Sequence, residues 1–494
     1  MRALAALALL LAWASPARAD SGAAFGESAR AASLASSVLA RPGDTSAIYF
    51  NPAGVADVDR PTLTLLGHAG FHRQRFARTG ELGDVEDRAV TGYGVSVVAP
   101  LPGPPWLRRV RLGGSVHLPG ETIIGVDAPV RRDAPVSLFY GNRTERTAVT
   151  FAASALLPWT IRIGVAVTVT PTLFAPTSVG FDANRGATVD EGVAIAQQRD
   201  LTLEPSVIVG ARAQPLDELA IGLVFRQGGA TRANGTFDIR AGAIRVLDEY
   251  SFYSLIAPME VGLGVAVWPL PTVSISLDAT WARWSTFRTI HDEAPDPGLS
   301  DTVELRAGLE WSAHRALAAR LGYAFLPSPV PEQTGFHNLL DAHRHEVAFG
   351  VGLDLEPLTG FALRIDLAAR FHAMHEQEAT KAPGAFAGAP IDNLGYPGFS
   401  ARGSFQQLSL SLTFGLGDRV SVEDDDDARD EAAGDEAEAD EAEPDESAGE
   451  EPPRAEAEHD STPQVAAPRD ATQEEAPDDH ATEDATQLER GGVE

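Results

Sequence analysis

The segment Thr359–Phe371 reads TGFALRIDLAARF and shows the pattern that decides the fold. Every second residue from Phe361 to Phe371 is apolar, and Arg364, Asp366 and Arg370 lie between them. Successive side chains of a β-strand point to opposite faces, so the segment predicts a strand with one apolar and one largely charged face. A soluble sheet that buries the apolar face fits this pattern, and so does the wall of a water-filled lumen.

The same alternation recurs along the chain, in 302–310, 346–355 and 407–416. Segments of about ten alternating residues, separated by turns, are typical of bacterial outer-membrane barrels. The predicted fold class is therefore all-β, a transmembrane antiparallel β-barrel. We count about fourteen strand-like segments, near 61–72, 90–101, 109–118, 145–157, 160–174, 200–213, 219–228, 251–268, 271–287, 302–312, 316–326, 343–355, 359–373 and 404–416.

The connections between these segments alternate in length. Those after even-numbered strands are short, such as 102–105, and those after odd-numbered strands are mostly long, such as 119–144 and 374–403. Short turns of outer-membrane barrels face the periplasm, so an even strand count places both chain ends there. Four tryptophans fall at the predicted short-turn ends, where an interfacial aromatic girdle belongs. They are Trp106, Trp159, Trp268 and Trp311.

The two ends of the chain lack the strand pattern. Residues 1–19 combine Arg2, an apolar run and a small-residue site ending at Ala19, which is typical of a secretory signal peptide. From Ser421 onward, 29 acidic residues and 4 arginines give −25 of the total net charge of −31. Such a segment cannot bury enough apolar surface to fold, so 419–494 is predicted to be a disordered acidic tail and 59–418 the barrel. The chain contains no cysteine, which excludes disulfides and thiolate metal sites.

Residues 20–58 precede the first strand and do not alternate. Their first half is rich in Ala and Ser, and their second half is punctuated by Pro and Gly. A barrel of about fourteen strands is too wide to be filled by its own side chains, so we predict that 20–58 forms a plug, or hatch, in the lumen. A disordered leader is the alternative, although Ile48, Tyr49 and Phe50 would be poorly placed in one.

Several motifs resemble the FadL-type outer-membrane transporters of long-chain fatty acids, a family that includes toluene-uptake relatives. The resemblance rests on GESARAAS at 26–33 followed by DTSAIYFNPAG at 44–54, and on DATWARWSTF at 278–287. RLGYAFLPSPVPEQT at 320–334 and LLDAHRH at 339–345 add to it. With the strand pattern, the resemblance covers residues 20–416 and leaves out the acidic tail.

This resemblance implies passive uptake of hydrophobic molecules. The ligand would be captured by extracellular loops, would enter an apolar lumenal pocket gated by the hatch, and would leave sideways near the third strand. The implied site residues are Phe25, by position only, and the hatch residues Asn51, Pro52, Ala53 and Gly54. Gly113 and Gly114, side by side in the third strand ahead of Pro119, are candidates for the exit because paired glycines weaken or bend a strand. A tight barrel corner with no opening is the alternative.

The inward strand positions carry charges of both signs, which predicts lumenal salt bridges that hold the plug. Arg306, Arg320 and Arg364 are also candidates for binding a ligand carboxylate, because arginine pairs with it through two hydrogen bonds. The implied partners are hydrophobic small molecules and outer-membrane lipid or lipopolysaccharide, with no nucleic acid, and a monomer is expected.

Other function classes have less support. No catalytic motif such as Gly-x-Ser-x-Gly is present, no cofactor is indicated, and the histidines offer no third metal ligand, so no enzyme is expected. A general diffusion porin needs no plug, and an adhesin needs longer loops. Long-chain fatty acids remain the favoured substrates, with aromatic hydrocarbons as the alternative.

Overall fold

The computed structural model describes residues 25–81, 83–120, 133–138, 146–174, 177–181, 193–197, 200–241, 244–289, 291–383 and 393–420. The expected signal peptide, 1–19, lies outside these residues, and so does the acidic tail from residue 421 onward.

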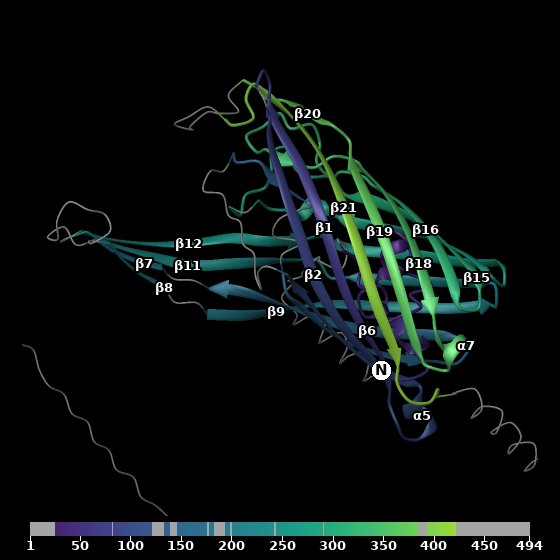
Figure 1. Ribbon diagram of the computed structural model, residues 1–494. Coiled ribbons are helices and arrows are strands. Elements are labelled where there is room, and N and C mark those ends of the chain that lie inside the picture. The colour runs from purple at the N-terminus through teal and green to yellow at the C-terminus, as the bar shows by residue number, and fades with distance from the viewer. Residues whose placement is uncertain are drawn as a thin grey trace, which may run out of the picture. The chain divides into compact units, whose positions relative to one another are not determined.

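Fourteen antiparallel strands form a closed barrel (Figure 1), because β1 pairs with β2 on one side and with β21 on the other. The predicted fold class is therefore confirmed. In order around the barrel the strands are β1 (Thr62–Arg78), β2 (Asp84–Pro100), β3 (Val110–Pro119), β5 (Ala148–Leu156), β6 (Ile161–Phe174), β9 (Asp200–Leu216), β10 (Leu219–Arg226), β13 (Met259–Leu270), β14 (Val273–Arg283), β15 (Thr302–His314), β16 (Leu317–Leu326), β18 (Arg344–Asp354), β19 (Leu363–Met374) and β21 (Gly398–Gly415).

Short and long connections lie at opposite ends of the barrel, which we call the turn end and the loop end. At the turn end, α5 (Pro105–Arg108) lies between β2 and β3, and α7 (Glu356–Thr359) lies between β18 and β19. At the loop end, the structure places η2 (Trp284–Thr286) after β14 and a two-residue parallel bridge between β4 (Val136–Ser137) and β17 (Leu339–Leu340). The strand β20 (Gln377–Thr380) pairs with β21 there.

The largest departure from the sequence prediction is an extension of the barrel sheet by four further strands beyond the wall. β11 (Gly229–Ala241) and β12 (Ile244–Ala257) form a hairpin between β10 and β13, and β11 also pairs in parallel with β7 (Thr177–Phe181). β8 (Val193–Gln197) completes this extension, which leaves the barrel on one side in Figure 1. The predicted single strand over 251–268 is therefore wrong. Pro258 lacks the N–H that a continuous ladder needs and separates β12 from β13.

The alternation in β19 is confirmed. Leu367 and Phe371 are exposed on the outer face, whereas Asp366 and Arg370 are buried on the inner face. Large apolar side chains are exposed in the same way around the barrel, for example Leu65, Val97, Phe151, Leu223, Leu263, Leu277, Leu305, Leu321, Phe349 and Leu410. A closed barrel with an apolar outer belt satisfies all backbone hydrogen bonds and can be solvated by lipid. Among the described residues, no helix is long and apolar enough to cross a bilayer.

Three of the four predicted girdle tryptophans are exposed at the turn end. The exposed fractions are 69% for Trp106, 88% for Trp159 and 52% for Trp311. Trp268 differs, because the exposed Val267 takes the outward position in β13 and Trp268 turns inward, with the guanidinium of Arg41 5.4 Å from its ring centre. Successive side chains of a strand face opposite sides of the barrel wall. An error of one residue in the predicted strand position therefore places a side chain on the wrong face.

Residues 25–58, which we call the plug segment, lie inside the ring of strands as the purple coils of Figure 1. They contain α3 (Ala29–Ser33), α4 (Ala47–Phe50) and the 3₁₀ helix η1 (Pro52–Asp57). Ser28 caps α3, because its hydroxyl accepts a hydrogen bond from the Ala31 N–H at 3.0 Å. The main apolar core joins this segment to small and branched wall residues. It includes Ile48, Tyr49, Phe50 and Val55 from the plug segment and Val98, Ala152, Ala166, Ile208 and Val224 from the wall.

Candidate functional site

Wall glycines let the plug segment approach the barrel backbone closely. A Cβ at Gly164 in β6 would overlap the backbone of Pro52, and a Cβ at Gly322 in β16 would overlap the backbone of Ala35. Only glycine leaves room for such contacts. The plug segment is thus seated directly against the strands.

Asn51 fastens the plug segment to the wall through its amide. Its Nδ2 donates to the carbonyl oxygens of Leu39 at 2.8 Å and Ala211 at 3.2 Å, and its Oδ1 accepts from the Ala53 N–H at 3.2 Å. The last bond caps η1, whose first residue is Pro52. The sequence-predicted residues Asn51, Pro52, Ala53 and Gly54 are therefore brought together and are all buried. Their contacts hold the plug segment in place.

A buried ion-pair network joins the plug segment to β15 and its neighbours. The carboxylate of Glu310 lies 3.0 Å from Arg30, 2.7 Å from Arg41 and 2.6 Å from Arg320. Arg30 and Arg41 belong to the plug segment, whereas Glu310 and Arg320 belong to the wall. Buried charges of this kind are tolerated only when they are paired and hydrogen-bonded. The lumenal salt bridges expected from the mixed charges are thus present.

A second ionic anchor lies near the end of the plug segment. Asp57 pairs with Arg212 at 2.7 Å and also with Arg162. The Nε of Arg212 donates in addition to the Ala40 carbonyl oxygen at 2.6 Å. Arg212 therefore bridges two separate stretches of the plug segment to β9.

Phe25 lies at the other end of the plug segment, beside two imidazole rings. The centre of its ring is 4.1 Å from that of His68 and 6.0 Å from that of His117, and the two imidazole centres are 5.2 Å apart. Gln407 donates to the Phe25 carbonyl oxygen at 2.7 Å. Sequence reasoning named Phe25 as a candidate by position only and did not name the two histidines. The feature of the sequence that could have identified these histidines is their inward-facing position in the alternating patterns of β1 and β3.

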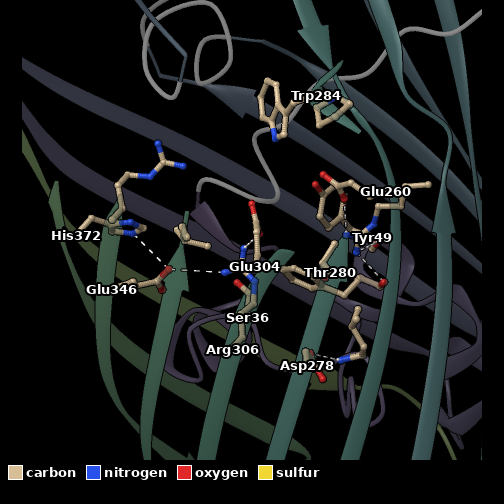
Figure 2. Close-up of a pocket in the computed structure, with 16 residues that line it drawn as sticks. Ser36, Tyr49, Glu260, Asp278, Thr280, Trp284, Glu304, Arg306, Glu346 and His372 are labelled. Atoms are coloured by element: carbon tan, nitrogen blue, oxygen red, sulfur yellow. Dashed lines mark hydrogen bonds and ion pairs between the residues drawn. The ribbon is translucent and has the colours of Figure 1, made fainter. Parts of the chain in front are cut away.

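A cavity of about 770 Å³, part of it open to solvent, lies on the loop-end side of the plug segment (Figure 2). Tyr49, Phe50 and Leu39 of the plug segment line it from one side. Trp284, at the start of η2, lines it at the loop end. The remaining lining is mostly charged and comes from the loop-end parts of the wall strands: Arg226, Glu260, Asp278, Glu304, Arg306, Arg344, Glu346 and His372. The cavity is amphipathic and differs in this respect from the apolar pocket that the resemblance implies.

Arg226 connects this wall to the aromatic side chains of the plug segment. Its Nη2 donates to the Phe50 carbonyl oxygen at 2.7 Å, and its Nη1 lies 3.1 Å from Glu260. The guanidinium is also 5.0 Å from the ring centre of Tyr49, within the range of a cation–π contact. Arg226 thereby fixes the aromatic floor of the cavity.

The three predicted carboxylate-binding arginines are not brought together. Arg306 lines the loop-end cavity, 2.6 Å from Glu304 and 3.2 Å from the Ala35 carbonyl oxygen. Arg320 is enclosed between Glu310 and Asp366. Arg364 lines a separate pocket at the turn end, whose empty space of about 830 Å³ includes open solvent. Of the three, Arg306 is placed to meet a molecule in the loop-end cavity.

Gly113 and Gly114 face opposite sides of β3. A Cβ at Gly113 would lie 2.9 Å from Cγ1 of Ile48 in the plug segment, whereas one at Gly114 would have no neighbour closer than 3.9 Å. The ladders of β3 with β2 and β5 run through both glycines without a register shift. The glycine pair therefore marks a close contact between wall and plug segment within a continuous sheet.

Two solved structures resemble the chain over nearly their whole length. A Pseudomonas aeruginosa FadL homologue has a TM-score of 0.55 and 16% identity, covering 79% of this chain and 98% of its own. The chain has a FadL-type fold. A mutant of TodX, a monoaromatic hydrocarbon channel, has a TM-score of 0.50 and 12% identity, covering 79% of this chain and 99% of its own. No protein-family model and no curated protein sequence matches the chain.

The FadL-type fold accounts for where the sequence motifs lie. The motif at 44–54 forms α4 and the start of η1, and the motif at 278–287 forms the end of β14 together with η2. The motif at 320–334 begins in β16 and continues into the following loop. The resemblance noted in the sequence is thus confirmed for the fold.

Proposed function

We propose that the protein carries hydrophobic molecules passively across the outer membrane, with long-chain fatty acids as its substrates. The observation that carries this proposal is the plug segment, which packs against the barrel wall and leaves an amphipathic cavity on its loop-end side. An open diffusion pore for hydrophilic solutes has no use for such a segment. The FadL-type fold supports the same class of substrate.

The lining of the loop-end cavity favours an amphipathic ligand over a bare hydrocarbon. Tyr49, Phe50 and Trp284 offer apolar surface, and Arg306 lies beside them with a guanidinium that a carboxylate could share with Glu304. A hydrocarbon gains nothing from a charged wall and would have to displace its water. A fatty acid can place its chain on the rings and its carboxylate at Arg306.

The route runs from the loops to the cavity and leaves sideways near β3 once the plug segment moves. Gly113 supports this exit, because the side chain nearest to its open inner face is Ile48 of the plug segment. Lateral exit suits the substrate, since a fatty acid gains about 0.8 kcal/mol for each methylene that leaves water. The β3 ladders must open locally for this step.

Uptake of aromatic hydrocarbons is the second candidate. The aromatic side chains of the cavity favour it, and TodX, which shares the fold, is named as a monoaromatic hydrocarbon channel. The charged lining argues against it.

Uptake by intact cells of a Gram-negative host that lacks such channels tests the proposal. The protein should accelerate entry of a labelled long-chain fatty acid and leave a labelled disaccharide excluded. Arg306→Gln should slow fatty-acid uptake without changing toluene uptake, whereas Arg315→Gln, an exposed substitution at the turn end, should change neither. Faster toluene uptake with unchanged fatty-acid uptake would favour the second candidate. Disaccharide uptake would contradict both.

A further inference from the structure

Two arginines face each other on the outer surface near the loop end. Arg75 of β1 lies directly opposite Arg402 of β21 in the antiparallel ladder, and both are exposed. Neither makes a hydrogen bond or ion pair within the part of the chain that the structure describes. Side chains in directly opposite positions have Cβ atoms only about 5 Å apart, and like charges there are destabilising. An anion between the two guanidinium groups would remove this repulsion.

Among the side chains that the structure describes, the neighbouring carboxylates do not supply that anion. Asp87 is already paired with Arg73, two residues before Arg75, which donates two hydrogen bonds of 2.8 and 3.1 Å to its carboxylate. On the other side of β21, Glu376 and Glu378 are exposed and form no ion pair with Arg402.

Three histidines extend the arginine pair along the same outer face. Next to β21 in the barrel lies β19, and next to β19 lies β18. His375 directly follows the last residue of β19. His343 directly precedes the first residue of β18, and His345 is the second residue of that strand. His345 and His375 stack with 4.9 Å between ring centres. Nδ1 of His343 accepts from the Ser328 N–H at 3.0 Å, so the neutral ring carries its proton on Nε2 and can donate it outward. We call these five residues the rim band: Arg75, Arg402, His375, His345 and His343.

The rim band lies on the loop-end side of the apolar belt. The last large apolar residues exposed before it are Phe71 in β1, Leu408 in β21, Phe371 in β19 and Val347 in β18. Lipid head groups occupy this zone of a membrane, next to the hydrocarbon core. Guanidinium groups match the geometry of phosphate, and imidazole N–H groups are additional donors to it.

We propose that the rim band binds the phosphate groups of a lipid in the leaflet that borders the loop end. Arg75 and Arg402 share one phosphate, and the histidines donate hydrogen bonds to the same head group. The proposal is independent of the transported substrate, because the rim band is on the outer face and the cavity is in the lumen.

Native mass spectrometry of the full-length barrel with diphosphorylated lipid A tests the proposal. We expect the lipid to bind the wild type and to bind Arg75→Gln/Arg402→Gln about tenfold more weakly or worse. Arg283→Gln, which removes an exposed arginine at the same end but outside the rim band, should bind as the wild type does. Lipid A stripped of its phosphates should not distinguish the double variant from the wild type. Equal binding of diphosphorylated lipid A to both proteins would overturn the proposal.

Thermal unfolding provides a readout that does not depend on lipid retention in the spectrometer. In plain detergent, Arg402→Gln should unfold at the same or a higher temperature than the wild type, because it removes a like-charge pair. With diphosphorylated lipid A the order should reverse. A variant that unfolds earlier in both conditions would show a purely structural role and would overturn the proposal. The same stabilisation by inorganic phosphate alone would show a free-anion site and would also overturn it.

Discussion

Glu310 is a wall carboxylate that pairs with two arginines of the plug segment and with one arginine of the wall. It holds Arg30 and Arg41 from the plug segment and Arg320 from β16. A buried charge without a partner costs much free energy. The Glu310 carboxylate is therefore needed to keep the plug segment packed against the wall. The sequence indicated mixed lumenal charges but not this convergence, because it depends on contacts between residues almost three hundred positions apart.

Glu310→Gln should loosen the plug segment. The substitution leaves three arginines without their shared carboxylate, and breaking a buried pair costs about 3–5 kcal/mol. Limited trypsin digestion should then cut after Arg30, which is followed by Ala31, far faster than in the wild type. Glu376→Gln, an exposed change without an ion pair among the described residues, is the control. Unchanged resistance to trypsin in Glu310→Gln would show that the network does not hold the segment.

Lys381 is the only lysine of the chain, and it lies at the loop end, where its Nζ donates to the His337 carbonyl oxygen at 2.6 Å. Burial lowers the pKa of this amine to about 8. Between about pH 8 and the ordinary lysine pKa, the unfolded chain binds more protons than the folded one. The free energy of unfolding should therefore rise with pH in that window.

A nuclear magnetic resonance titration of ¹³C-labelled lysine should give one side-chain signal with its midpoint near pH 8. The matched control is the same protein unfolded in denaturant, where the midpoint should return to the ordinary lysine value. Equal midpoints in the two states would show that Lys381 is solvated in the folded protein.

Among the elements, β3 and α4 form the contact most relevant to lateral exit. Gly113 has room for Ile48 only because it has no side chain, whereas the outward Gly114 has free space. The sequence singled out the glycine pair as a weak point of the wall. It could not show that only one of the two meets the plug segment, because facing depends on the register of the whole barrel.

Gly113→Val should slow fatty-acid uptake, since the valine fills the space beside Ile48 that the substrate needs for lateral exit. Overpacking of this kind typically costs about 1–3 kcal/mol. Gly114→Val should leave uptake unchanged, and Ile48→Ala added to Gly113→Val should restore it. Uptake rates in cells, normalised to the amount of heat-modifiable barrel, are the measurement. Equal effects of the two valines would place the exit elsewhere.

For the whole molecule, strand number, pairing order and the alternation of long and short connections could be predicted from the sequence. Period-two patterning and the turn residues are local properties, and each strand carries them independently. The β7, β8, β11 and β12 extension was missed because 229–250 lacks a clean lipid-facing alternation and its pairing partner, β7, lies about fifty residues earlier. The sequence did not show that Trp268 points inward or that Arg306, Arg320 and Arg364 lie apart. Both features depend on how far along the barrel a residue lies and on which face of its strand it occupies.

Uptake through a barrel with its plug segment locked tests the central claim most directly. A Cβ at Gly308 would lie 3.3 Å from Cβ of Leu34, close to the separation of about 3.5–4.5 Å in disulfides, and the chain has no other cysteine. Leu34→Cys/Gly308→Cys, with Ser276→Ala to make room, would join the plug segment to β15. Labelled long-chain fatty acid should enter cells only after the disulfide is reduced, and disaccharide should stay excluded in both states. Fatty-acid uptake at the same rate through the oxidised and the reduced barrel would contradict the account.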